Sequence, residues 1–221
     1  MNGIHALNST FDYLNNSLNL FGFNFPKFDL RDSRCFKYME NLEEDELFQI
    51  NASLLSYNDL INDGPLPNET DGSQNKRYLQ KFLNKFELDL SPKFLNDIID
   101  GHIIEVYSKS HKQIYRSINF FSSSSYDLGA LTFTPWDKLF YRPEEETNKL
   151  LKAANYTLEN NIDYMTPNIP THFLTELCSE KIFGYKLIKI GCVYDSVSFY
   201  PMGYVTIISV KEVLGTFKVI H

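Results

Sequence analysis

Apolar residues recur at helical spacing in the first part of the chain. Leu7, Phe11, Leu14 and Leu18 are three or four residues apart, so they would line one face of a helix. A second helix is predicted over residues 41–55, because the acidic residues at its start suit the positive end of a helix dipole. We therefore interpret residues 1–75 as a helical, acidic region. Its last part, 62–75, is typical of a linker, since it holds only one large apolar side chain.

Residues 76–107 are predicted to contain more closely spaced elements. Apolar residues at helical spacing run from 78 to 86, and Ser91-Pro92 is a typical helix start, so residues 76–99 are interpreted as connecting helices. Residues 102–107 are largely apolar, which favours a short strand.

Two further helices are expected before the chain changes character. Pro143 is followed by three glutamates, which predicts a helix that runs to about residue 160. After two more prolines, a short helix is expected to carry Phe173, Leu174 and Leu177.

The final forty residues favour strands. β-Branched residues and tyrosines replace asparagines, and apolar residues alternate over 188–194, with further strands predicted at 203–210 and 216–220. Because side chains alternate along a strand, we expect one inward face to be shared by Ile104, Val106, Ile188, Ile190 and Tyr194.

Four segments in this order resemble a known family. Residues 100–106 (DGHIIEV) look like the first strand of a PAS domain, and residues 126–131 (YDLGAL) resemble its GYSxEEL segment. Residues 136–145 (WDKLFYRPEE) resemble the DLxHPED segment, and residues 191–208 resemble the closing hairpin. The match is incomplete, because no middle strand is evident between Asn160 and Lys186.

The resemblance implies an α+β fold for residues 100–221. We expect a PAS-like antiparallel five-stranded sheet with helices on one face, preceded by the helical N-terminal region. Residues 102–139 also look like the sensory half of LuxR-type bacterial transcriptional regulators, but no helix-turn-helix follows up to His221. A sensory role in signal transduction or transcription regulation is what this likeness implies.

A dense set of aromatic residues supplies the candidate ligand site. PAS-like folds place the helical segment across the sheet, and an apolar pocket with a few polar groups is typical of small-molecule binding. Such residues also fill ordinary cores, and that alternative stays open. The predicted lining, for an apolar small molecule, is Phe121, Tyr126, Trp136, Phe140, Tyr204 and Ile208.

Composition narrows the function classes. The net charge is −7, and residues 1–75 hold twelve acidic against four basic side chains, so no basic surface for nucleic acid is expected. No apolar run approaches the roughly 20 residues that span a bilayer. Cys35, Cys178 and Cys192 form no CxxC pair, and no secretion signal is evident, which favours a reduced, cytoplasmic setting.

No recognisable catalytic or metal-binding spacing occurs among the histidines and cysteines. Flavin-binding and haem-binding motifs are also absent from the PAS-like segment, so we expect no cofactor and no metal. The leading hypothesis is a non-enzymatic PAS-like sensory domain that binds a small apolar ligand or a protein partner and forms a homodimer. The alternative is a stand-alone interaction or effector protein with no small-molecule ligand.

Overall fold

The computed structural model describes residues 2–20, 36–39, 73–99, 101–179 and 181–213, with isolated positions between 47 and 59. Most of the helix predicted over 41–55, most of the linker predicted over 62–75 and the whole strand predicted over 216–220 lie outside the described residues. The helices are α1 (Asn2–Leu20), α2 (Phe36–Met39), α4 (Ser73–Lys85), α5 (Pro92–Asn96), α6 (Asn119–Ser123), α7 (Leu128–Phe133), α8 (Trp136–Leu139) and α9 (Glu144–Glu159). The strands are β1 (Leu88–Leu90), β2 (His102–Ser108), β3 (Gln113–Arg116), β4 (Phe140–Tyr141), β5 (His172–Glu176), β6 (Ile182–Asp195) and β7 (Pro201–Glu212).

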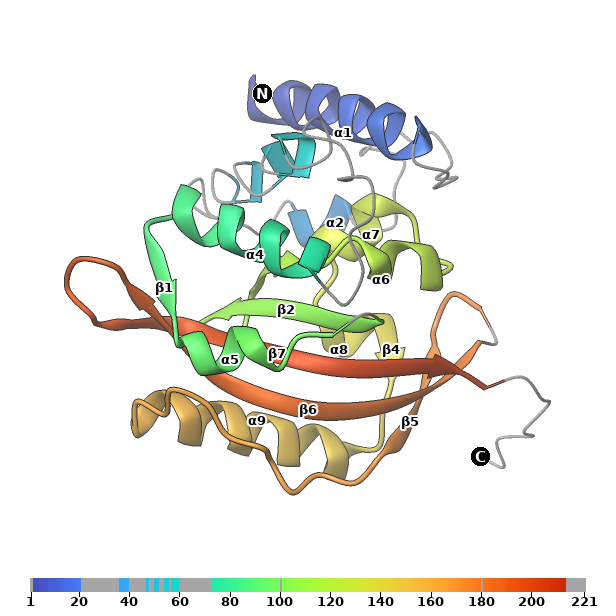
Figure 1. Cartoon of the computed structure of the whole chain (residues 1–221). Helices are drawn as coiled ribbons and strands as arrows, with labels where there is room; N and C mark the ends of the chain where they lie inside the picture. Colours follow the sequence, from blue (N-terminus) through green and yellow to red (C-terminus); the bar gives the residue numbers. More distant parts are fainter. Residues whose placement is uncertain are drawn as a thin grey trace.

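One curled antiparallel sheet forms the centre of the fold (Figure 1). Its strand order is β3-β2-β7-β6-β5-β4, and β1 pairs with the end of β6. The strands predicted at 102–107, 188–194 and 203–210 all lie in this sheet, which confirms their pairing. Seven strands occur within the described residues, so the predicted number of five is too small.

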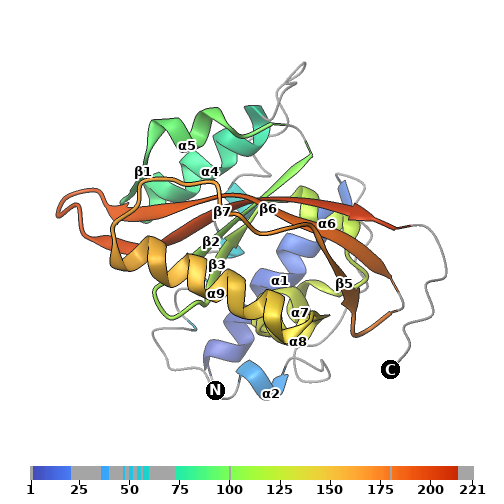
Figure 2. The same ribbon diagram turned by 90° about the horizontal axis from the view of Figure 1, so that it is seen from below.

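Helices cover both faces of the sheet, and the prediction of helices on one face is wrong. Helix α9 lies along β6 and β7 on one side, whereas α1, α4, α6 and α7 lie on the other (Figures 1 and 2). The sequence of β2 explains why both sides are covered: all five of its inner positions, 103–107, are buried. A strand that is buried on both faces needs a packing layer on each of them.

The segment around Leu174 is a strand rather than the predicted short helix. His172 and Leu174 are buried while Phe173, between them, is 59% exposed, which is the period-two pattern of an edge-side strand. Backbone pairing confirms it, because Phe173 lies opposite Gly184 of β6. Leu177 lies just beyond β5 and is exposed.

The predicted inward face mixes two faces of the sheet. Ile104 pairs with Ile207, and Ile190 pairs with Thr206. Successive residues of β7 point to opposite faces, so Ile104 and Ile190 do too. A register shift between Leu187 and Lys189 also changes the alternation within β6.

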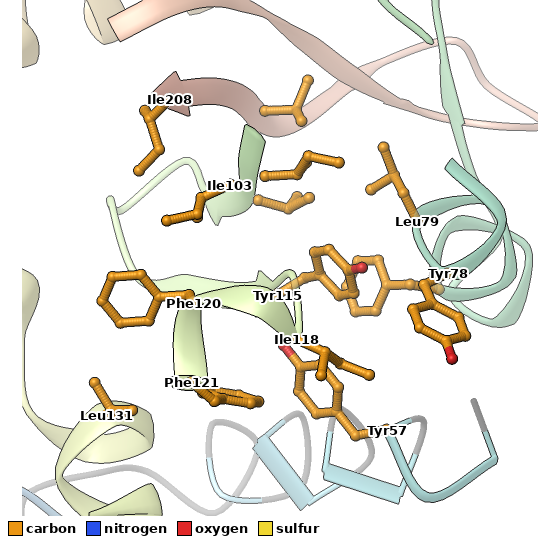
Figure 3. Close-up of a cluster of buried hydrophobic side chains, with 14 of the residues drawn as sticks. Tyr57, Tyr78, Leu79, Ile103, Tyr115, Ile118, Phe120, Phe121, Leu131 and Ile208 are labelled. Atoms are coloured by element: carbon orange, nitrogen blue, oxygen red, sulfur yellow. The ribbon is translucent and has the colours of Figure 1, made fainter. Parts of the chain in front are cut away.

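The predicted stripe of α1 is buried, which confirms that it faces the domain. Leu14 and Leu18 are at most 1% exposed, and the ring centroid of Phe11 lies 5.7 Å from that of Phe133 on α7. This layer continues into the cluster around Tyr57 and Tyr115 (Figure 3). Helix α1 is therefore packed against α7 on this side of the sheet.

Candidate functional site

A cavity of about 60 Å³ lies between the sheet and helix α9. Its walls are mostly apolar and come from α9, β5, β6, β7 and the segment that joins α6 to β4. The apolar lining includes Leu150, Leu151, Ala154, Leu174, Leu187 and Ile190.

The segment from α6 to α8 closes one side of the cavity. It connects β3 to β4, which are the two ends of the main strand order, so it runs from one edge of the curled sheet to the other. The Phe120 ring lies edge-on to Phe140 with centroids 6.4 Å apart, and Phe140 lies edge-on to Phe183 at 6.3 Å. Aromatic contacts thus hold the two edges of the sheet together around the cavity.

The structure brings four of the six predicted site residues to this cavity: Trp136, Phe140, Tyr204 and Ile208. Phe121 does not line it; its ring lies edge-on to that of Tyr57, 5.6 Å away, in the N-terminal layer (Figure 3). Tyr126 does not line the cavity either, but its ring packs against Phe140, which does.

Tyr126 holds the loop around Phe140 in place. Its hydroxyl donates to the carbonyl of Leu139 and accepts the backbone N–H of Leu177 at 3.0 Å. Its ring lies edge-on to Phe140 at 5.9 Å. Burial raises the pKa of the Tyr126 phenol, which therefore stays protonated at neutral pH.

A polar row crosses the otherwise apolar floor of the cavity. Arg116 on β3 pairs with Glu105 on β2, and Glu105 pairs with Thr206 on β7, so their side chains share one face. The Arg116 Nε donates to the Glu105 carboxylate at 2.8 Å, and the two side chains are only 5% and 6% exposed. An ion pair buried so deeply is costly to desolvate, so its presence by itself is weak evidence for stability.

Two neutral donors complete the shell of Glu105. The Tyr107 hydroxyl donates to one carboxylate oxygen at 2.7 Å, and the Gln113 side-chain amide donates to the other at 2.9 Å. Burial and the neighbouring Glu105 charge raise the pKa of Tyr107 well above its ordinary value, so this phenol remains a donor.

Three polar atoms of the lining residues lack hydrogen-bond partners within the described part of the chain. They are Nη1 of Arg116, Nε of Arg142 and the hydroxyl oxygen of Thr206, and all three are buried. The Arg142 guanidinium lies over the rings of Trp136 and Tyr185, 4.9 and 4.7 Å from their centroids. Buried polar groups in native proteins are normally paired, so unpaired ones in a cavity wall point to a missing ligand or water.

The backbone of Arg116 connects the cavity to the N-terminal layer. The Tyr57 hydroxyl donates to the carbonyl oxygen of Arg116 at 2.5 Å and accepts its N–H at 2.6 Å. The Tyr57 ring stacks on that of Tyr115, with centroids 5.7 Å apart. A displacement of Arg116 would therefore shift or break its two hydrogen bonds to Tyr57 in the N-terminal layer.

Metal-ligating and nucleophilic side chains also lie outside the cavity. No cluster of three or more His, Cys, Asp or Glu side chains that could hold a metal occurs among the residues the structure describes. The Cys192 thiol is buried, donates to the carbonyl of Thr157 at 3.1 Å, and has a pKa raised by burial, which opposes the reactive thiolate form. Across the described helices, none is long and apolar enough to cross a membrane.

Comparison with models of known protein families and with curated proteins finds no match to this chain.

The charged residues of the cavity were missed by the sequence interpretation. Glu105 had a detectable signal, because a carboxylate within an apolar strand that is buried on both faces needs a partner. Arg116 follows Lys109, His111 and Lys112 in the sequence, a basic cluster typical of a solvated face, but pairing of β3 with β2 buries it. Arg142 gave no signal, since it follows the two-residue strand β4.

Proposed function

We propose that this protein is a non-enzymatic, PAS-like sensory domain that binds a small molecule between the sheet and α9. The observation that carries the proposal is the cavity itself, with apolar walls and buried polar atoms that have no partner among the described residues. A fully packed interior would be expected to leave no such cavity. Concave, mostly apolar sites with a few fixed polar groups are the usual form of small-molecule sites.

The strand order supports the PAS resemblance. When β2 is counted as the first strand and both β1 and the two-residue β4 are left out, the sheet runs 2-1-5-4-3. The antiparallel order supports the PAS resemblance, and β5 lies between Asn160 and Lys186, where the sequence showed no strand. Fold likeness supports a sensory role only by analogy, so the cavity remains the main argument.

The proposed mechanism is a shift between two packings of the N-terminal layer. A ligand that contacts the Arg116 side chain would change the equilibrium only if it prefers one of the two packings. Tyr57, which holds both backbone groups of Arg116, supplies the physical connection. The flanking helices would then carry the signal.

The proposal is tested by ligand-induced stabilisation. A panel of small neutral and charged molecules is screened by thermal unfolding, with the emission of Trp136, the single tryptophan, as a second readout. Any molecule that binds only the folded state raises the melting temperature in proportion to RT ln(1 + [L]/Kd). Absence of any shift across the panel would remove the proposal.

A matched pair of variants locates the binding. Ala154 on α9 lines the cavity, whereas its neighbour Ala153 does not. We expect Ala154→Leu to fill the cavity and abolish the ligand-induced shift, while Ala153→Leu keeps it. Equal shifts in the two variants would place the ligand elsewhere.

A second candidate function, a protein-interaction module, is favoured by one surface. The hairpin between β6 and β7 exposes Val197, Phe199 and Tyr200 by 79%, 70% and 61%. Exposed apolar groups that cluster in this way are typical of interaction sites. If this is the function, Val197→Ser together with Phe199→Ser reduces self-association in sedimentation experiments, and the Ala154→Leu variant has no effect on it.

A further inference from the structure

The charge of the cavity wall indicates what kind of molecule it binds. Among the described residues, its charged lining consists of Glu105, Arg116 and Arg142. Glu105 and Arg116 compensate each other at 2.8 Å. Arg142 has no ion-pair partner in the described part of the chain, although its guanidinium lies over two aromatic rings. The cavity therefore carries one uncompensated positive charge.

The unpaired atoms at the wall are predominantly donors. Nη1 of Arg116 and Nε of Arg142 can only donate hydrogen bonds, and the Thr206 hydroxyl can donate or accept. The side chain of Arg116 is only 5% exposed, so bulk water does not hydrogen-bond to its guanidinium group. Donors of this kind match an anion, and a planar guanidinium is especially suited to a carboxylate.

Tyr185 lines the cavity together with both arginines, and the Arg142 guanidinium lies over its ring. The pKa of its buried phenol is raised, chiefly by burial, while the nearby charges of Arg142 and Arg116 act in the opposite direction. Arg116, Arg142 and Tyr185 all line the same cavity. This arrangement places the two positive charges around one space rather than at separate surfaces.

The size of the cavity limits the ligand. Its volume is about 60 Å³, and about 10–15 Å³ of such space holds one water molecule. The space matches a ligand of only a few non-hydrogen atoms. The apolar wall formed by Ala154, Leu187 and Ile190 would accommodate a short alkyl group.

We propose that the ligand of this cavity is a small monocarboxylate of two or three carbons, such as acetate or propionate, recognised by Arg116, Arg142 and Thr206. This inference rests on the proposed sensory function and replaces its apolar ligand by an anionic one. The carboxylate supplies the negative charge and the acceptors that the wall lacks, and the alkyl group contacts the apolar side.

Calorimetric titration tests the inference with matched probes. Acetate and propionate are compared with acetamide and propionamide, which have nearly the same shape but no charge, and with chloride and nitrate at the same ionic strength. We expect the carboxylates to bind and the amides to bind at least about tenfold more weakly, since hydrogen bonds to charged groups are the strong ones.

Variants assign the binding to the cavity. Arg142→Gln is the main variant, because Arg142 is in no ion pair of the described residues and its loss should leave the fold intact. It is expected to weaken propionate binding about tenfold or more. Thr206→Val is expected to weaken it by a smaller factor. Lys152→Gln on the exposed side of α9 removes the same charge outside the cavity and should leave affinity unchanged.

Each outcome has a distinct meaning. If amides bind as tightly as carboxylates, the ligand is selected by shape and the inference is wrong, although the proposed function stands. Equal binding of nitrate or chloride would show a general anion site and also overturn it. Equal losses in Arg142→Gln and Lys152→Gln would place the anion outside the cavity. If no probe and no other small molecule of the screening panel binds, the inference and the proposed function both fall.

Discussion

Separating the buried pair of Glu105 and Arg116 should destabilise the fold strongly. Glu105→Leu removes the acceptor of three buried or half-buried donors, at 2.8, 2.7 and 2.9 Å, and leaves the Arg116 charge in a cavity wall. Removal of one partner of a buried pair costs about 3–5 kcal/mol. For a chain of this size, a loss of 1 kcal/mol lowers the melting temperature by about 2–4 °C. We therefore expect a decrease of about 6–20 °C.

The double variant gives the sharper result. Arg116→Met alone leaves the Glu105 carboxylate with two neutral donors. Its loss of unfolding free energy is therefore expected near the lower end of the 3–5 kcal/mol range, about 3 kcal/mol. Glu105→Leu combined with Arg116→Met removes both charges. The remaining cost is the loss of the hydrogen bonds that Tyr107 and Gln113 donate to the carboxylate, about 1–3 kcal/mol of unfolding free energy. The double variant should thus be more stable than Glu105→Leu alone.

Urea unfolding, followed by circular dichroism, measures these differences. The control is Lys85→Met, which breaks an ion pair of similar length, 2.8 Å, whose side chains are 37% and 69% exposed. Exposed pairs contribute about 0–1 kcal/mol, so little change is expected. If both single variants lose less than about 1 kcal/mol and their effects simply add in the double variant, the pair is well hydrated and the reasoning about a buried polar row is wrong.

Two further predictions concern backbone packing and pH. Gly203→Ala places a Cβ 2.0 Å from the backbone oxygen of Tyr107 and should cost about 1–3 kcal/mol or prevent folding, whereas Gly184→Ala, with its nearest atom at 3.8 Å, should be nearly neutral in thermal melts. Burial lowers the pKa of His172, so below about pH 6.5 the unfolded chain binds more protons than the folded one. Stability should therefore fall between pH 7 and 5, and less steeply in His172→Gln; identical slopes would contradict this.

Local periodicity was sufficient to predict much of the scaffold. The apolar stripe of α1, the helix that begins after Pro143, and the strands around 102–107 and 203–210 all occur as predicted. Each depends on spacing within one segment, where a helical or alternating pattern determines which side is buried. Aromatic density and the PAS resemblance predicted Trp136, Phe140, Tyr204 and Ile208 as lining residues, and these four line the cavity.

The remaining features depend on contacts between distant segments. Phe173 and Leu174 were expected in a helix because the segment is short, and only pairing with β6 makes it a strand. The register shift after Leu187 reverses which residues of β6 face Ile104, and no local pattern reports such a shift.

The charged wall of the cavity is likewise a product of tertiary structure. Arg116, Glu105 and Thr206 become neighbours only when β3, β2 and β7 pair in their observed register. Arg142 joins them because the chain crosses from one edge of the sheet to the other before α9. The sequence by itself determined which segments are apolar enough to form the layers; strand register, a long-range property, decided which polar groups meet between them.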